Sequence, residues 1–167
     1  MDKATISLML NESILGTLEK ISPGFSQYMN ESVWDDSQLE QLAAEYCHIF
    51  VLPGKKHVSL RMSHWINEGT FDTAVLENVI AEMEFDFESL KVSKTPTDHL
   101  GVLLYFMSGI YSSEDEGINN MSADLEKQLF FWITAFEAKL KASTENPFYL
   151  ACGALLKETL NATSESL

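Results

Sequence analysis

The sequence predicts an all-α fold, and three observations lead to this prediction. Apolar residues recur at intervals of three and four along several segments, which is the spacing of one buried helix face. Proline and glycine separate these segments where helices ordinarily begin and end. No two segments alternate in the manner of a β-hairpin. We therefore expect one helical bundle, a single domain covering residues 1–167.

The N-terminal part of the chain predicts two longer helices and a short one between them. The first helix should cover about residues 4–20, because Pro23 and the glycine after it follow its last apolar position. A short helical turn is expected near residues 25–29. The next helix should begin at Ser37, where Glu40 completes a capping box.

The middle of the chain is less regular. Pro53 and the following glycine should end the preceding helix. Residues 54–69 alternate as a strand would, yet they begin with lysines typical of an exposed loop, so we expect a long, partly ordered connection. A helix should follow over about residues 71–87. Another should begin at Pro96, which suits a first helical position, and end near Ser112.

Two helices are predicted for the last part of the chain. A helix over about residues 120–142 carries a broad apolar stripe, which places Trp132 in the core. Asn146 and Pro147 form an N-cap and first-turn pair for the last helix, which should fray after Asn161.

The charge balance excludes one class of partner. The chain has 25 acidic and 11 basic residues and a formal net charge of -14. Such a charge repels the phosphates of nucleic acids and anionic membrane surfaces, so we expect no nucleic-acid partner. An acidic surface would attract a basic peptide, although acidity also serves solubility alone.

The cysteines and the N-terminus indicate the compartment. Cys47 and Cys152 lie within apolar helical patterns, where buried free thiols in a reducing environment are expected. The first residues do not resemble a signal peptide, and no apolar stretch of about 18 residues could span a membrane. The sequence therefore predicts a cytoplasmic protein without a membrane span.

Motifs of enzymes and metal sites are absent from the sequence. It contains no G-x-x-x-x-G-K-[ST], G-x-S-x-G, H-E-x-x-H or C-x-x-C. The four histidines and two cysteines lack the spacing of metal ligands. We therefore expect no catalytic activity, no metal and no cofactor.

Asp98 and His99 stand out as polar residues at the mouth of an apolar helix. Asp98 follows Thr95 by three residues, so it can cap the first turn, and it can still present an oxygen to a ligand. His99 should be neutral beside the positive end of the helix dipole, either as a partly buried, hydrogen-bonded residue or as a ligand contact. Trp65, in the irregular segment, could cover the core or contact an apolar peptide.

Three segments carry motifs of one known family. Residues 95–107 resemble a Pro-x-Asp-His-Leu-Gly-x-x-Leu-x-Phe-Met motif, and residues 42–53 are similar to a Glu-Tyr-x-x-Leu-Phe-x-x-Pro segment. Residues 132–149 resemble a closing pair of helices. All three are similar to segments of the TorD/DmsD/NarJ chaperones, which mature bacterial molybdoenzymes. The resemblance extends in order over about residues 37–160. It implies a TorD-like all-helical chaperone whose two halves are joined by a hinge near residues 87–96.

The resemblance also implies a partner. This would be the twin-arginine signal peptide of a molybdenum oxidoreductase precursor, bound while the cofactor is inserted and before export. Asp98 would accept from an arginine and His99 would bond to the peptide backbone, because such a peptide needs an acidic rim beside an apolar groove. Trp65, Tyr46 and Pro53 would border its apolar part. The family includes monomers and domain-swapped homodimers, and either is expected.

Other functions stay open at this point. A branch of the family holds the body of a redox-enzyme subunit without depending on a signal peptide. GTP binding is associated with some members, although this chain has no P-loop. A helical adaptor that binds an unrelated helix in its groove would also fit.

Overall fold

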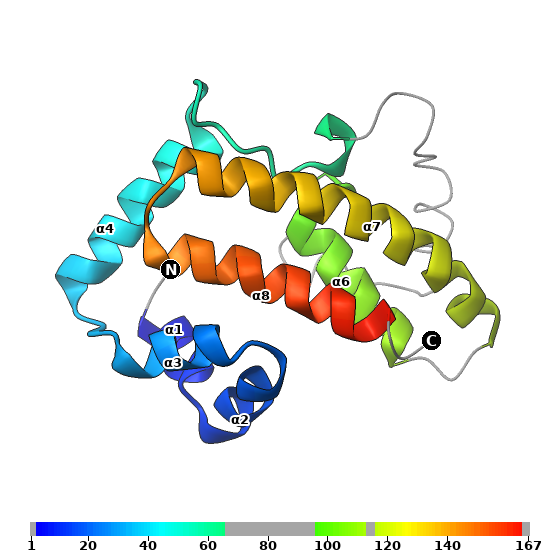
Figure 1. Cartoon of the computed structure of the whole chain (residues 1–167), viewed down its shortest axis with the longest axis horizontal. Coiled ribbons are helices and arrows are strands. Elements are labelled where there is room, and N and C mark those ends of the chain that lie inside the picture. Colours follow the sequence, from blue (N-terminus) through cyan, green and yellow to red (C-terminus); the bar gives the residue numbers. More distant parts are fainter. Residues whose placement is uncertain (1–2, 66–95, 113–115, 165–167) are drawn as a thin grey trace. The chain divides into compact units, whose positions relative to one another are not determined.

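The regular structure of the chain is helical, as the sequence predicts. The computed structural model describes residues 3–65, 96–112 and 116–164. Within these ranges every regular element is a helix, and the extended pairing is limited to one isolated bridge between Arg61 and His99 (Figure 1). The predicted helix over residues 71–87 lies outside the described residues.

The chain divides into two compact units. The terminal unit comprises Met1–Val58 and Ile133–Leu167, and the central unit comprises Ser59–Trp132. The prediction of a single domain stays a prediction. The hinge expected near residues 87–96 lies outside the described residues except for Pro96, and it also stays a prediction.

The terminal unit begins with three short helices where the sequence predicts one long helix and a turn. Helix α1 covers Lys3–Met9, α2 covers Glu12–Ile21 and α3 covers Pro23–Glu31. The prediction of one helix over residues 4–20 is wrong because Asn11 accepts a hydrogen bond from the Ser13 amide at 3.0 Å and caps a new helix there. Helix α3 confirms the predicted turn and extends it, and it packs against α2 and α8 (Figure 1).

Helix α4 covers Asp36–Tyr46 and continues as one π-helical segment, Cys47–Val51. The Asp35 carboxylate accepts from the Gln38 amide at 2.8 Å, so the helix begins at Asp36 and the predicted start at Ser37 is wrong. Pro53 follows the end of the π-helical segment, as expected. Cys47 is exposed here, which corrects the prediction of a buried thiol.

Helices α7, Glu116–Ser143, and α8, Pro147–Ser164, are joined by three residues. Asn146 accepts from the Phe148 amide at 3.0 Å, which confirms the predicted cap. Within the terminal unit, the Glu137 carboxylate bonds to Lys141 on α7 at 2.7 Å and to Lys157 on α8 at 3.1 Å. The Glu137 carboxylate therefore links α7 to α8 through its ion pair with Lys157.

Two titratable side chains of α8, those of Tyr149 and Cys152, are at least partly buried in the terminal unit. The Tyr149 hydroxyl on α8 donates to the Leu42 carbonyl of α4 at 2.6 Å. Burial raises the pKa of Tyr149, so this hydroxyl stays protonated and able to donate. Burial also raises the pKa of the half-buried, free Cys152 thiol to about 12, which keeps it unreactive.

Helix α6, Leu100–Tyr111, belongs to the central unit and turns one side inward. Its buried residues follow helical spacing: Val102, Leu103, Phe106, Met107 and Ile110. Trp132, at the end of this unit, is fully buried as predicted. The helix ends where expected, but the predicted start at Pro96 is wrong, because the first helical residue is Leu100.

Candidate functional site

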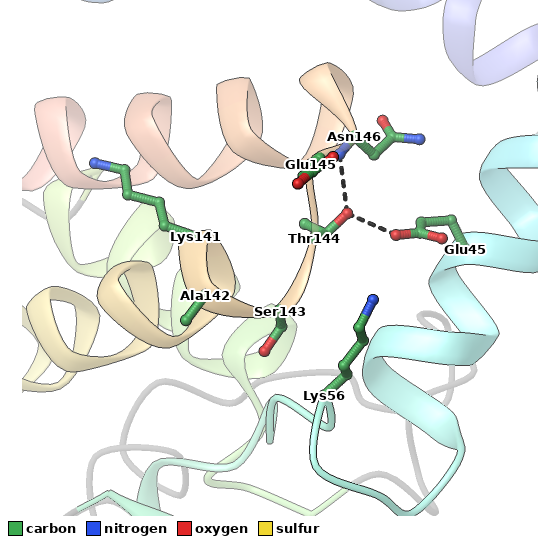
Figure 2. Close-up of a pocket in the computed structure, with 8 residues that line it drawn as sticks. All are labelled: Glu45, Lys56, Lys141, Ala142, Ser143, Thr144, Glu145 and Asn146. Carbon is green, nitrogen blue, oxygen red and sulfur yellow. Dashed lines mark hydrogen bonds between the residues drawn. The ribbon is translucent and has the colours of Figure 1, made fainter.

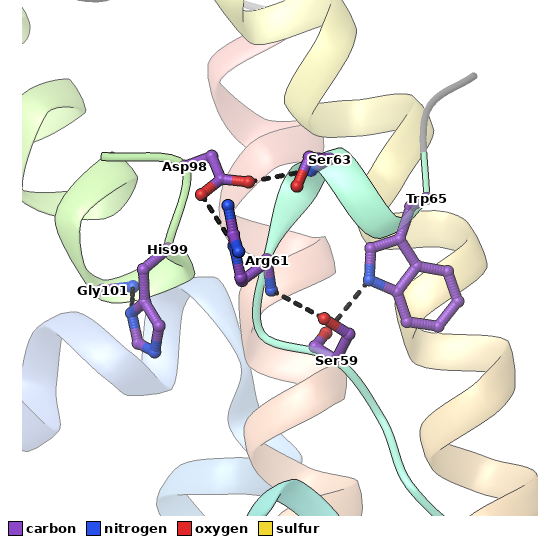
Figure 3. Close-up of polar contacts among 7 residues, drawn as sticks. All are labelled: Ser59, Arg61, Ser63, Trp65, Asp98, His99 and Gly101. Atoms are coloured by element: carbon purple, nitrogen blue, oxygen red, sulfur yellow. Dashed lines mark hydrogen bonds and ion pairs between the residues drawn. The ribbon is translucent and has the colours of Figure 1, made fainter. Parts of the chain in front are cut away.

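The carboxylate of Asp98 is the centre of a polar cluster in the central unit. Asp98 is 3% exposed, and its Oδ1 accepts from Arg61 Nε at 3.0 Å. Its Oδ2 accepts from the Ser63 backbone amide at 3.1 Å. Figure 3 shows this carboxylate turned toward Arg61 and Ser63, so both of its oxygens are occupied.

The backbone brings these residues together across 37 positions of sequence. The Met62 amide donates to the Asp98 carbonyl at 2.9 Å, and the Leu100 amide donates to the Leu60 carbonyl at 2.8 Å. These two bonds flank the antiparallel bridge between Arg61 and His99. In its described part, the segment after Val58 has one 3-10 turn, at Met62–His64, and is otherwise irregular. This agrees with the partly ordered connection predicted for residues 54–69.

The capping roles differ from the prediction. His99 is the N-cap of α6, and its Nδ1 accepts from the Gly101 amide at 3.2 Å. Asp98 does not cap this helix, because its carboxylate faces the segment that contains Arg61 and Ser63 (Figure 3). The proposed Thr95 cap lies outside the described residues. Asp98 thus joins two segments, and His99 begins the helix.

The charge state of Asp98 follows from its neighbours. Burial alone would raise the pKa of this carboxyl, but hydrogen bonds from Ser63 and Arg61 and the positive charge of Arg61 outweigh burial. The pKa of Asp98 therefore lies below its usual value of 3.8, and the group is ionised at neutral pH.

The imidazole of His99 is neutral. Burial lowers the pKa of His99, and the opposing attraction of Asp98 does not restore it. Because Nδ1 accepts from the Gly101 amide, the proton of the neutral ring is on Nε2. His99 is thus able to donate one hydrogen bond from Nε2.

The pH dependence of stability should show the contribution of Asp98. A lowered pKa in the folded state stabilises the fold above the unfolded pKa, and this stabilisation disappears as pH falls through the folded value. We expect the difference in free energy of unfolding between wild type and Asp98→Asn to be largest at neutral pH and to shrink below about pH 4. Urea unfolding at a series of pH values measures it. A difference that stays constant down to pH 2 would contradict this assignment.

Trp65 lies at the end of the same segment. Its Nε1 donates to the Ser59 carbonyl at 3.0 Å, and its ring meets His64 edge to face. The side chain is half-buried, with the indole turned back along its own segment (Figure 3). The structure therefore brings Trp65, Asp98 and His99 into one unit.

Tyr46 and Pro53 belong to the terminal unit. Tyr46 is exposed and contacts the Phe50 ring, with 5.1 Å between ring centroids. Pro53 is exposed too, as are the neighbouring Val51 and Leu52. Tyr46, Val51, Leu52 and Pro53 are thus exposed apolar residues near the end of the π-helical segment, and we call them the apolar surface of the terminal unit.

A separate hollow of about 600 Å³ lies in the terminal unit between α4, Lys56 and the α7–α8 connection (Figure 2). The Thr144 hydroxyl donates to the Glu45 carboxylate at 2.6 Å and accepts from the Asn146 amide at 3.0 Å. Two lysines and two glutamates line the hollow, namely Lys56, Lys141, Glu45 and Glu145. Its charges therefore balance, and they favour neither an anion nor a cation.

Sequence reasoning missed Arg61 and Ser63 as members of the cluster. Both lie in the segment where the helical pattern is absent, so no periodicity marked them. One signal was available, because Arg61 is the single arginine of the chain. Within the described residues no group of His, Cys, Asp or Glu could hold a metal ion, and no helix is long and apolar enough to cross a bilayer.

Comparison with known proteins defines the class. The nitrate reductase delta subunit family matches residues 11–141, which is more than half of the chain. The chain therefore belongs to this family of NarJ/TorD-type chaperones, which is a family of non-enzymes.

A particular relative supports the same assignment. The chain is 26% identical over 126 residues to the chaperone protein TorD of Salmonella arizonae. The alignment covers 72% of this chain and 57% of that protein. No solved structure is significantly similar to the chain.

Proposed function

We propose that the protein is a cytoplasmic chaperone that binds the twin-arginine signal peptide of a molybdoenzyme precursor and assists cofactor insertion before export. Its family and its similarity to a TorD chaperone support a role in the maturation of redox enzymes. The observation that carries the peptide-binding part is the Asp98 carboxylate, which is ionised, buried and already bonded to a guanidinium.

Three features of the central unit and the net charge support the proposed contacts. A carboxylate in a fixed position prefers arginine over lysine, because the guanidinium offers several donors in a rigid plane. His99 lies next to Asp98 in sequence and can donate from Nε2 to a peptide carbonyl. Trp65 offers a half-buried ring for apolar contact in the same unit. The net charge of -14 would attract a basic peptide to the protein.

Isothermal titration with two synthetic peptides tests this function. One peptide carries two adjacent arginines followed by an apolar stretch, and the other carries two lysines in their place. We expect the arginine peptide to bind at least about tenfold more tightly, a difference of about 1.4 kcal/mol. Equal affinity for the two peptides, or binding of neither, would contradict the proposal.

Variants locate the contact. His99→Ala and Trp65→Ala should each weaken binding of the arginine peptide, since they remove a donor and an apolar surface. Gln27→Ala is the control, because Gln27 is an exposed residue of α3 in the terminal unit and is not among the predicted peptide contacts. If Gln27→Ala weakens binding as much as His99→Ala, the peptide binds elsewhere. Tyr46→Ala and Pro53→Ala test separately whether the apolar surface of the terminal unit contributes.

A second function has one observation in its favour. The matching family takes its description from the nitrate reductase delta subunit. This description favours a role in assembling the body of a redox-enzyme subunit. Pull-down with a precursor lacking its signal peptide separates the two functions. Capture of that truncated precursor, together with no binding of the arginine peptide, would favour the second function.

A further inference from the structure

We propose that Arg61 occupies, in the free protein, the place on Asp98 that an arginine of the bound peptide takes, and that it leaves when the peptide binds. This inference rests on the proposed function. Arg61 would thus keep Asp98 paired until the peptide arrives, a role that the resemblance to the family does not imply.

The ion pair has one fixed and one loosely held partner. The side chain of Asp98 is 4% exposed, whereas that of Arg61 is 55% exposed, and they meet at 3.0 Å through Arg61 Nε. About half of the Arg61 side chain is therefore already in water. Moving it fully into water costs much less than exposing a buried carboxylate without a partner.

The position of the carboxylate does not depend on the Arg61 side chain. Oδ2 of Asp98 is held by the Ser63 amide, and the Asp98 carbonyl is held by the Met62 amide. The backbone of Arg61 is fixed independently, because its amide donates to the Ser59 hydroxyl at 3.1 Å. When the guanidinium leaves, Asp98 keeps its place and presents Oδ1.

An exchange of one guanidinium for another avoids the main cost of recognition by a buried charge. Folding has already removed Asp98 from water, so the incoming arginine only has to replace Arg61. A lysine lacks the planar fork and competes poorly, and an uncharged side chain cannot compete at all. The fixed carboxylate therefore sets the preference for arginine, while Arg61 lowers by one common factor the affinity of every ligand that needs Asp98.

The chain's single arginine permits a direct test on the wild-type protein. In 15N-labelled protein, Arg61 gives the only arginine Nε–Hε signal, and an unlabelled peptide adds none. On saturation with the twin-arginine peptide we expect this signal to move to the position of a solvent-exposed arginine. A signal that stays unchanged at saturation would overturn the exchange.

Affinities supply the second measurement. Arg61→Gln removes the competitor, so the twin-arginine peptide should bind about three- to tenfold more tightly. Lys56→Gln, in the other unit, is the matched control, because it changes the net charge equally and should leave affinity within about twofold. Weaker or unchanged binding by Arg61→Gln would overturn the inference.

The same titrations separate this inference from the proposed function. Binding by wild type with no gain in Arg61→Gln rejects the exchange alone. Binding by neither protein rejects both proposals. Should Arg61→Gln fail to fold, Arg61→Lys replaces it, and a smaller gain in affinity is expected because lysine holds Asp98 less well.

Discussion

Asp98→Ala is expected to lower the free energy of unfolding by about 2–3 kcal/mol, because it leaves the Ser63 amide and the Arg61 guanidinium without their acceptor. The cost stays below that of a fully buried ion pair, since Arg61 is half-exposed. Urea unfolding followed by circular dichroism at neutral pH measures it. The variant should remain folded, because a domain of this size ordinarily has a stability of about 5–15 kcal/mol.

The control for this variant is Asp35→Ala. Asp35 is an exposed N-cap whose carboxylate accepts one bond from the Gln38 amide, so its loss should cost about 1 kcal/mol. If Asp98→Ala costs no more than Asp35→Ala, the Asp98 cluster does not join its two segments as described. The comparison separates the loss of a buried acceptor from the loss of any capping carboxylate.

Phe106→Ala should have the largest effect on stability, about 3–5 kcal/mol, because it removes a fully buried aromatic side chain from the core of the central unit. Helix α6 presents this side inward and carries His99 at its N-terminus. Loss of Phe106 should therefore also weaken peptide binding in proportion to the unfolded fraction. Urea unfolding with the same readout measures the change.

Leu104→Ala is the matched control on the same helix. Leu104 is 38% exposed, so its truncation should cost less than about 1 kcal/mol. Comparable costs for the two variants would mean that α6 does not turn the Phe106 side inward. Intact peptide binding by Leu104→Ala would show that the N-terminus of α6 tolerates changes on its exposed side.

A local cap identified the start of α8, whereas two other local caps were missed. Asn146 and Pro147 identified the start of α8 because an N-cap and a first-turn proline act within two or three residues. Asn11 and Asp35 are equally local caps, yet the neighbouring apolar pattern concealed Asn11, and the capping box at Ser37 competed with Asp35. Those errors moved or divided helices without changing the fold class.

The pairing of Asp98 could not be predicted from local rules. A proline, an acid and a following apolar run suggested a capped helix start, which is a contact within one turn. The actual acceptor contacts come from Arg61 and Ser63, far earlier in the sequence. Such pairing depends on how an irregular segment lies against α6, and no periodicity records that. Composition alone could have drawn attention to Arg61, since the sequence contains no other arginine.

The most direct test of the central claim is a double-mutant cycle between Asp98 and the first peptide arginine. Wild type and Asp98→Asn are each titrated with the twin-arginine peptide and with a peptide in which that arginine is replaced by glutamine. Direct contact predicts a coupling energy of at least about 1 kcal/mol, because the two changes then remove the same interaction. A coupling energy near zero, with both single changes still weakening binding, would mean that Asp98 shapes the site without touching the peptide.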